Sequence, residues 1–538
     1  MAGACIPAPP PPPAPPPPPP APPPPPPPPM LSSGQPDEAA ARERVAPRDT
    51  AAFNTEEYNL IQENPFRLAA ENPLSTFAID VDAASYSNVR RFLRERRMPP
   101  RDAVRIEELI NYFDYEYPDP TGEHPFSINT EVSAAPWNPQ HRLVQVGLQG
   151  RRMDTRELPP GNLVFLLDVS GSMNEPNKLP LVKESMRLLV NQLRPQDRVA
   201  IVVYAGAAGL VLPSTPGNQR ERILGALNRL EAGGSTAGGQ GIVLAYETAR
   251  EAFIPGGNNR VILATDGDFN VGVSSESGLV QLIEQKRDTG IFLTVLGFGT
   301  GNYSDARMEQ LADHGNGNYA YVDQIAEARK VLVREIGGTL LTIAKDVKVQ
   351  VEFNPARVRA YRLIGYENRV MANEDFNDDR KDGGELGAGH SVTALYEIVP
   401  VGVAMPVPET GPLRYQETMP RPGAASSTEL LTVKLRYKAP EGERSWLMEQ
   451  PVRDRGTALA ATSTDFRFAA AVAQWGMLLR NSRWKGNSSW TAAAELARGA
   501  LGHDEHGYRA EFIRLLEESR ALAENQPPAA DRTTGSER

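Results

Sequence analysis

The chain has 538 residues and a net charge of −10, which is long enough for about two to four domains and one large core. The acidic balance argues against a nucleic-acid-binding protein, which would normally present a basic face. A single cysteine excludes an internal disulfide and any cysteine-based zinc site. No stretch approaches the ~20 apolar residues that a transmembrane helix needs.

Residues 1–52 are predicted to be a disordered, proline-rich tail. Within it, residues 7–29 are almost pure proline, which favours an extended polyproline helix and suits a stiff stalk. The small residues Ala2, Gly3 and Ala4 before Cys5 resemble the end of a bacterial lipoprotein signal, in which the cysteine is acylated. Cys5 is therefore either a lipidation site, through which alone the protein would contact a membrane, or an exposed thiol in the tail.

Residues 53–158 are predicted to form an N-terminal α+β region. A strand over 76–82 precedes two helices, over 83–97 and 104–113, and two alternating strands, over 126–133 and 142–149. Asp82 is expected to cap the first helix. A cation site formed by Asp80 and Asp82 is the less favoured alternative.

Residues 159–340 alternate strand and helix, which is typical of a doubly wound, mostly parallel sheet. The predicted strands cover 163–168, 199–204, 208–212, 260–265, 291–297 and 318–322. The predicted helices cover 177–193, 219–230, 239–253, 277–288, 304–313 and 324–337. Only three residues separate the second and third strands, so these two should be antiparallel neighbours.

Polar side chains follow the first strand of this sheet. The apolar run Leu163–Leu167 ends in Asp168, Ser170 and Ser172, whose spacing brings a carboxylate and two hydroxyls to the edge where open α/β sheets place their ligand sites. Oxygen donors with no histidine or cysteine nearby favour Mg²⁺ or a similar hard cation over zinc.

The pattern Asp-x-Ser-x-Ser at 168–172 resembles the metal-ion-dependent adhesion site (MIDAS) of von Willebrand factor type A domains. Two further pieces of that site follow in order, Thr236 in a Gly-Gly-Ser-Thr stretch and Asp266 after the strand at 261–264. The resemblance implies five metal-binding residues: Asp168, Ser170, Ser172, Thr236 and Asp266. It also implies that the hydroxyls bind the ion, that the carboxylates contribute charge directly or through water, and that a partner protein supplies an Asp or Glu carboxylate. Mg²⁺ is the expected ion, with Mn²⁺ and Ca²⁺ as alternatives.

The similarity extends beyond this domain to YfbK-like bacterial proteins. It lies in the stretches 75–82, 88–93, 387–398 and 507–512 and covers roughly residues 53–525. Residues 341–525 are predicted to be a C-terminal β-sandwich-like and helical domain, and 526–538 a second disordered tail. Because that family has no settled biochemical activity, the resemblance implies an architecture more firmly than a function.

An enzyme is not expected. Ser170 is not a nucleophile-elbow serine, because Asp168 and Ser172 stand where that motif needs glycines. The favoured hypothesis is a cation-dependent protein-binding module of the bacterial cell envelope, with no nucleic-acid partner. The alternative is an accessory subunit of an AAA+ ATPase or chelatase-like machine, which would be cytoplasmic if no signal sequence lies upstream of Met1.

Overall fold

The computed structural model describes residues 56, 58–154, 156–234, 238–267, 276–301, 304–381, 383–405 and 423–525. Cys5, the proline-rich stretch, Thr236 and the tail at 526–538 therefore lie outside the described residues. Within the described part of the chain, every helix is too short or too polar to cross a membrane.

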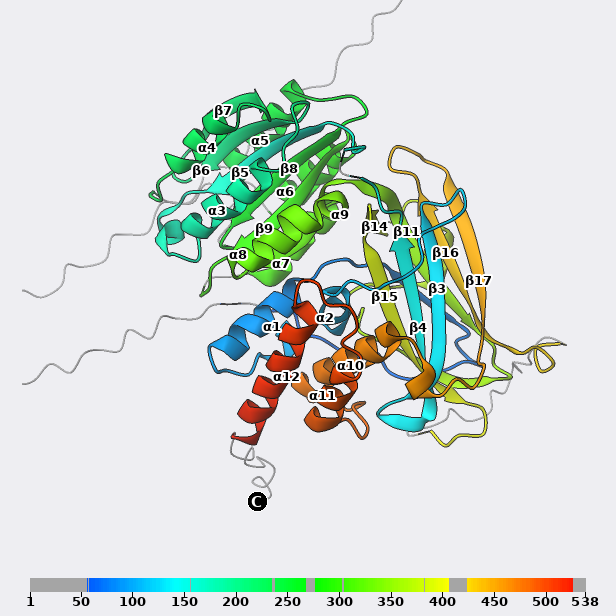
Figure 1. Ribbon diagram of the computed structural model, residues 1–538. Coiled ribbons are helices and arrows are strands. Elements are labelled where there is room, and N and C mark those ends of the chain that lie inside the picture. The colour runs from blue at the N-terminus through cyan, green and yellow to red at the C-terminus, as the bar shows by residue number, and fades with distance from the viewer. Residues whose placement is uncertain are drawn as a thin grey trace, which may run out of the picture. The chain divides into compact units, whose positions relative to one another are not determined.

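A six-stranded sheet, drawn mainly in green in Figure 1, forms the central part of the chain in the order β10-β9-β8-β5-β6-β7. Its strands are β5 (Gly161–Asp168), β6 (Arg198–Tyr204), β7 (Ala208–Pro216), β8 (Asn258–Thr265), β9 (Ile291–Phe298) and β10 (Tyr319–Val322). All neighbouring pairs are parallel except β6 and β7, which are antiparallel as predicted from their short connection. The chain leaves β5 toward β6 on one side and returns to β8 on the other, so the strand order reverses at β5.

Helices cover both faces of this sheet. They are α3 (Leu179–Val190), α4 (Arg220–Asn228), α5 (Gly238–Glu251), α6 (Glu276–Arg287), α7 (Asp305–His314), α8 (Ile325–Arg329), the π-helix η3 (Lys330–Arg334) and α9 (Ile336–Leu340). Alternate residues of β5 face opposite sides: Phe165 packs in the cluster that contains α3 and α4, and Val164 in the one that contains α5, α6 and α7. The doubly wound α/β fold is confirmed.

The single helix predicted over 324–337 is instead divided into α8, η3 and α9. In η3 the Glu335 N–H donates to the carbonyl of Lys330 at 3.0 Å, five residues back, and the two side chains form an ion pair. This contact fits the wider turn of a π-helix and interrupts the regular α-helix.

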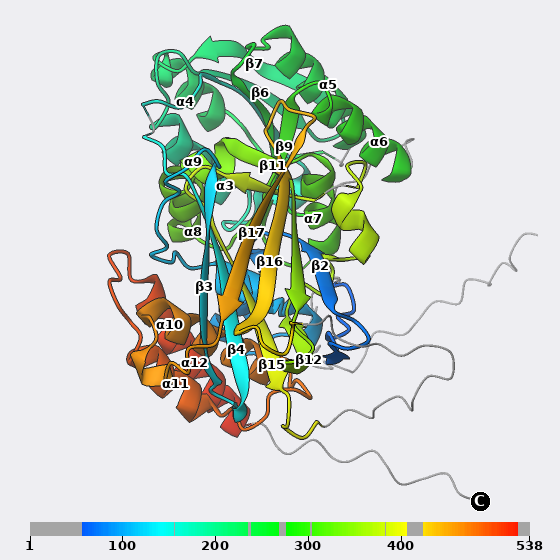
Figure 2. The same cartoon turned by 90° about the vertical axis from the view of Figure 1, so that its right-hand side faces the viewer.

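Two antiparallel sheets pack face to face beside the central domain. Their strands are β1 (Arg67–Leu68), β2 (Leu74–Ala78), β3 (Phe126–Ala135), β4 (Asn138–Gly150), β11 (Thr342–Phe353), β12 (Val358–Ile364), β13 (Val370–Met371), β14 (Gly384–Gly387), β15 (Ser391–Pro400), β16 (Glu429–Lys438) and β17 (Ser445–Arg453). One sheet has the order β1-β12-β15-β4-β3 and the other β13-β2-β11-β16-β17, with β14 also paired to β11 (Figure 2). Val146 and Tyr396 of the first sheet share a hydrophobic core with Val349 and Val433 of the second.

Both sheets combine strands from before and after the central domain. Strand β2 pairs with β11, and β4 pairs with β15. The two stretches that the sequence suggested as separate regions therefore build one β-sandwich, because each supplies strands that complete the hydrogen bonding of the other.

A group of helices packs against the sandwich. It contains α1 (Ala84–Arg94), α2 (Ile106–Asn111), α10 (Thr464–Leu479), α11 (Trp490–Arg498) and α12 (Tyr508–Glu524). Elsewhere in the described chain, short 3₁₀ turns lie at η1 (Arg101–Ala103), η2 (Gly171–Asn174), η4 (Asn373–Asn377) and η5 (Leu459–Ala461). The common core of the helix group includes Tyr86, Phe113, Trp475 and Phe512, so N-terminal and C-terminal helices are packed together.

The expected helix cap at Asp82 is wrong. Helix α1 has Ala83 at its N-cap and makes no side-chain cap hydrogen bond. Instead, Asp82 Oδ1 accepts a hydrogen bond from the backbone N–H of Tyr319, at 2.9 Å, at the start of β10. A contact between residues so far apart in the chain outweighs the local capping preference.

Candidate metal centre

The two carboxylates predicted to bind metal lie at the carboxyl ends of adjacent parallel strands. Asp168 is the last residue of β5, Asp266 follows β8, and both side chains are completely buried. This edge, at the point where the strand order reverses, is where open α/β sheets bind their ligands.

The loop after β5 holds its oxygen atoms in a compact arrangement. Asp168 Oδ1 accepts a hydrogen bond from the Ser170 N–H at 2.8 Å, and Asp168 Oδ2 accepts one from the Thr265 hydroxyl at 3.3 Å. The hydroxyl oxygens of Ser170 and Ser172 are 3.0 Å apart. Ser170 is buried whereas Ser172 is exposed, so the group of oxygens reaches the surface.

Burial raises the pKa of Asp168 to about 6, the Ser170 N–H opposes that rise, and the negative charge of Asp266 adds to it. The ionised form of Asp168 is therefore poorly stabilised by its surroundings, and a bound cation would stabilise it by supplying positive charge. Two carboxylates and two hydroxyls are donors that fit a hard divalent cation such as Mg²⁺.

Thr236 lies outside the described residues, but the loop just before it is described. The Gly171 N–H donates to the Gly234 carbonyl at 3.0 Å, and the Gly233 N–H donates to the Val169 carbonyl at 2.7 Å. These bonds tie the loop that leads to Thr236 to the Asp168 loop. The structure therefore gathers Asp168, Ser170, Ser172 and Asp266 at one edge of the sheet.

Sequence reasoning missed Lys178. Its Nζ atom lies 3.0 Å from Asp266 Oδ2, and only 4% of its side chain is exposed. A lysine near the start of a predicted helix is normally a solvated residue, and nothing in the local sequence pairs it with an aspartate 88 positions downstream.

A second group of carboxylates is buried where α2 and α7 approach β2. Oxygens of Asp80, Glu108 and Glu309 lie within 4.8 Å of one another. Arg369 Nε is 3.2 Å from Asp80 Oδ2, and Arg105 is paired with Glu108. Because guanidinium groups already provide positive charge here, we interpret this group as a buried ion-pair network that joins the central domain to its neighbours.

Two buried carboxyl groups, Glu107 of α2 and Glu309 of α7, give a pH prediction. Burial raises the pKa of Glu107 and of Glu309 to about 7, and Glu107 Oε2 has no hydrogen-bond partner among the described residues. A carboxyl group whose folded pKa is raised stabilises the fold at low pH, and this contribution is lost as the pH rises toward the folded pKa. Between about pH 4.5 and 7, each group should therefore lower the free energy of unfolding as the pH rises.

Glu107→Gln should therefore raise the thermal midpoint at pH 8 and flatten its dependence on pH, because it removes a buried charge that the fold compensates poorly. Thermal melts from pH 5 to 8 provide the measurement. The exposed Glu116→Gln serves as the matched control and should follow the wild type. If the thermal midpoints of the wild type and Glu107→Gln change equally with pH, the prediction is contradicted.

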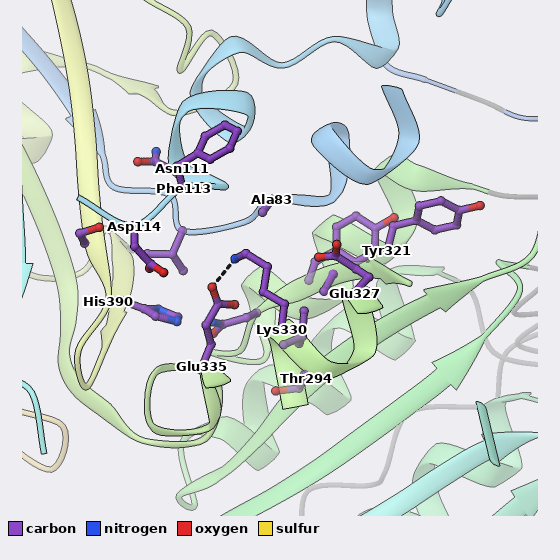
Figure 3. A pocket seen from close by; sticks show the side chains of 16 residues that line it. Ala83, Asn111, Phe113, Asp114, Thr294, Tyr321, Glu327, Lys330, Glu335 and His390 are labelled. Atoms are coloured by element: carbon purple, nitrogen blue, oxygen red, sulfur yellow. Dashed lines mark hydrogen bonds and ion pairs between the residues drawn. The ribbon is translucent and has the colours of Figure 1, made fainter. Parts of the chain in front are cut away.

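A small cavity lies where α8 and η3 meet the loops that contain Asp114 and His390 (Figure 3). Lys330 is paired with Glu335, and the partly buried His390 faces the pair from the opposite wall. Burial and the charge of Lys330 lower the pKa of His390 to about 4. The cavity has a volume of about 40 Å³, which is enough for a water molecule but far below the size of a usual ligand pocket. None of the predicted metal-binding residues lines it.

Three family descriptions match successive parts of the chain. "von Willebrand factor" matches residues 52–145, "von Willebrand factor type A domain" matches residues 162–333, and "Uncharacterized protein YfbK, C-terminal" matches residues 338–522.

Known relatives include the uncharacterized protein YfbK of Escherichia coli K12, which is 45% identical over 470 residues, 86% of this chain and 81% of that protein. A UPF0353 protein of Mycolicibacterium paratuberculosis is 28% identical over 203 residues, 36% of this chain and 58% of its own length.

Among solved structures, a von Willebrand factor type A protein from Catenulispora acidiphila is 17% identical with a TM-score of 0.39, over 75% of this chain and 92% of that one. A mussel byssus protein, proximal thread matrix protein 1 with a zinc-occupied MIDAS motif, is 25% identical with a TM-score of 0.26, over 32% of this chain and 44% of that one.

Proposed function

The chain belongs to the YfbK family, and on that premise we propose that its von Willebrand factor type A domain binds a partner protein through a divalent cation. Domains of this type commonly are metal-dependent protein-interaction modules and generally are not enzymes. The cation would be held by Asp168, Ser170, Ser172, Thr236 and Asp266, and a carboxylate of the partner would complete its coordination.

One observation carries the proposal. Two fully buried carboxylates from adjacent strands meet two hydroxyls at an edge where Ser172 reaches the surface. Lys178 offsets only one of these two buried negative charges, so the pair still needs further positive charge, and the exposed side of the site lets a second protein reach an ion bound there.

Mg²⁺ is the proposed ion, with Mn²⁺ and Ca²⁺ as the alternatives. Mg²⁺ prefers about six oxygen ligands and usually retains some of its water. When bound here, the ion would supply a positive charge that attracts an Asp or Glu side chain. The protein's own groups would fix its position, and the loops around Ser172 would determine which partner fits.

The test is a pull-down from envelope extracts of the producing cell, with and without a chelator, using the wild type and Asp168→Ala as baits. Capture that needs both the metal and Asp168 supports the proposal. Capture that survives chelation and the substitution contradicts it.

We also propose that the protein works at the cell envelope, held by a lipid on Cys5 and set away from the membrane by the proline-rich stretch. The support is the sequence Ala-Gly-Ala-Cys at positions 2–5, with the proline-rich stretch beginning two residues later at Pro7. Cys5→Ser should move the protein from the membrane fraction to the soluble fraction of the cell, as followed by immunoblotting. An unchanged distribution would contradict the lipid anchor.

A further inference from the structure

The candidate metal centre already contains a positive charge of its own. Lys178 Nζ lies 3.0 Å from Asp266 Oδ2, in a pair whose side chains are 4% and 0% exposed. We propose that Lys178 is the resident counter-ion of this centre, an inference that rests on the proposed function. Lys178 neutralises Asp266 before a cation binds, and the entering cation has to compete with the lysine for this carboxylate.

The fold reserves space for this lysine. Lys178 lies at the N-cap of α3, and its side chain passes over Gly299, which follows β9. A Cβ atom on Gly299 would lie 2.4 Å from Lys178 Cε, and Gly299 also has a φ of +76°. The Gly299 carbonyl in turn accepts a hydrogen bond from the Tyr321 hydroxyl at 2.7 Å. The lysine is therefore enclosed by backbone that is itself held in place.

The charge of Lys178 affects how tightly the centre can bind a cation. Asp168 and Asp266 carry two negative charges, and the Lys178 ammonium offsets one of them. A divalent cation that binds between the carboxylates meets repulsion from an ammonium group that is shielded from water and hydrogen-bonded to one of its own ligands. Repulsion of this kind is strong in a buried site, where the effective dielectric constant is low. Lys178 thus lowers the affinity of the centre for cations.

The test compares cation binding by the wild type, Lys178→Met and Lys178→Arg. Calorimetric titration with MgCl₂ or MnCl₂ should show binding about tenfold tighter for Lys178→Met than for the wild type, because the repulsive charge is gone while a side chain of similar length still fills the space. Lys178→Arg, which keeps the charge, should bind like the wild type. The rise in thermal midpoint on saturation with Mg²⁺ should be larger for Lys178→Met than for the wild type.

Lys183→Met is the matched control, since Lys183 lies on the same helix and donates instead to the carbonyls of Asn228 and Leu230. It should leave the cation affinity unchanged. If Lys178→Met fails to fold without metal, recovery of its fold on addition of Mg²⁺ supports the proposal, and failure to recover overturns it.

The other outcomes separate this proposal from the proposed function. If the wild type binds the cation and Lys178→Met binds it equally or more weakly, the counter-ion role is wrong and the metal centre stands. If only Lys178→Met binds, the counter-ion role is supported and the wild type is not the metal-dependent module proposed above. If neither binds, both proposals are wrong.

Discussion

Asp168→Ala should abolish partner capture and lower the cation affinity by more than about 100-fold. The substitution removes a carboxylate that lies between the Ser170 N–H and the Thr265 hydroxyl, so it deletes charge and also frees the loop that presents Ser170 and Ser172. Calorimetric titration with Mg²⁺ measures the loss of affinity, and the pull-down measures the loss of the partner.

The fold should survive this substitution. Because burial raises the pKa of the Asp168 carboxyl, the metal-free protein holds that negative charge at a cost, and removing it relieves the cost. Circular dichroism and the thermal midpoint provide the check. Asp288→Ala, which removes an exposed aspartate of the same domain, should retain both binding activities. If Asp168→Ala binds Mg²⁺ as tightly as the Asp288 variant does, the metal centre is assigned to the wrong residues.

Arg90→Ala should lower the free energy of unfolding by about 3–5 kcal/mol, the usual cost of removing one partner from a buried ion pair. Arg90 lies on α1 with its side chain 1% exposed, and its Nη2 is 2.5 Å from Asp323 Oδ1 and 2.6 Å from Glu327 Oε2. Its Nη1 is 3.1 Å from Glu511 Oε2 on α12. One guanidinium therefore joins the end of the central domain to helices from both ends of the described chain.

Without Arg90, the carboxylates of Asp323 and Glu327 remain buried with much of their compensating charge removed. Burial raises the pKa of Asp323, and Arg90 is the largest influence that opposes the rise. Urea denaturation of the full chain measures the effect. Arg94→Ala is the matched control: Arg94 pairs with Glu511 from the same helix but is 45% exposed, so its loss should cost no more than ~1 kcal/mol. If the two variants lose similar amounts of unfolding free energy, the ion pairs of Arg90 are not the main stabilising contacts at this junction.

The central fold and the close placement of Asp168, Ser170 and Ser172 were predictable because their signals are local. The run Leu163–Leu167 indicates a strand buried on both faces, and the three-residue link after Tyr204 permits only an antiparallel return. The spacing of Asp168, Ser170 and Ser172 then places their side chains together.

Other features depend on contacts that no local pattern reveals. Asp82 matches a helix cap by position, yet it binds the backbone of Tyr319 across the boundary with the central domain. Lys178 is charged and near a helix start, yet it is buried because Gly299 leaves room for it. The pairing of β2 with β11 was equally hidden, because each strand alone shows only its own alternation of apolar and polar residues.

That pairing has a consequence for how the protein is made. Ala78 of β2 faces Lys348 of β11, so the ribosome must translate the entire central domain before β2 can find its neighbour. Chains generally fold from the N-terminus as they emerge, and pairings between distant segments form slowly. Strand β2 and the edge of β4 that later pairs with β15 therefore stay unpaired while the central domain folds, and open strand edges of this kind promote aggregation.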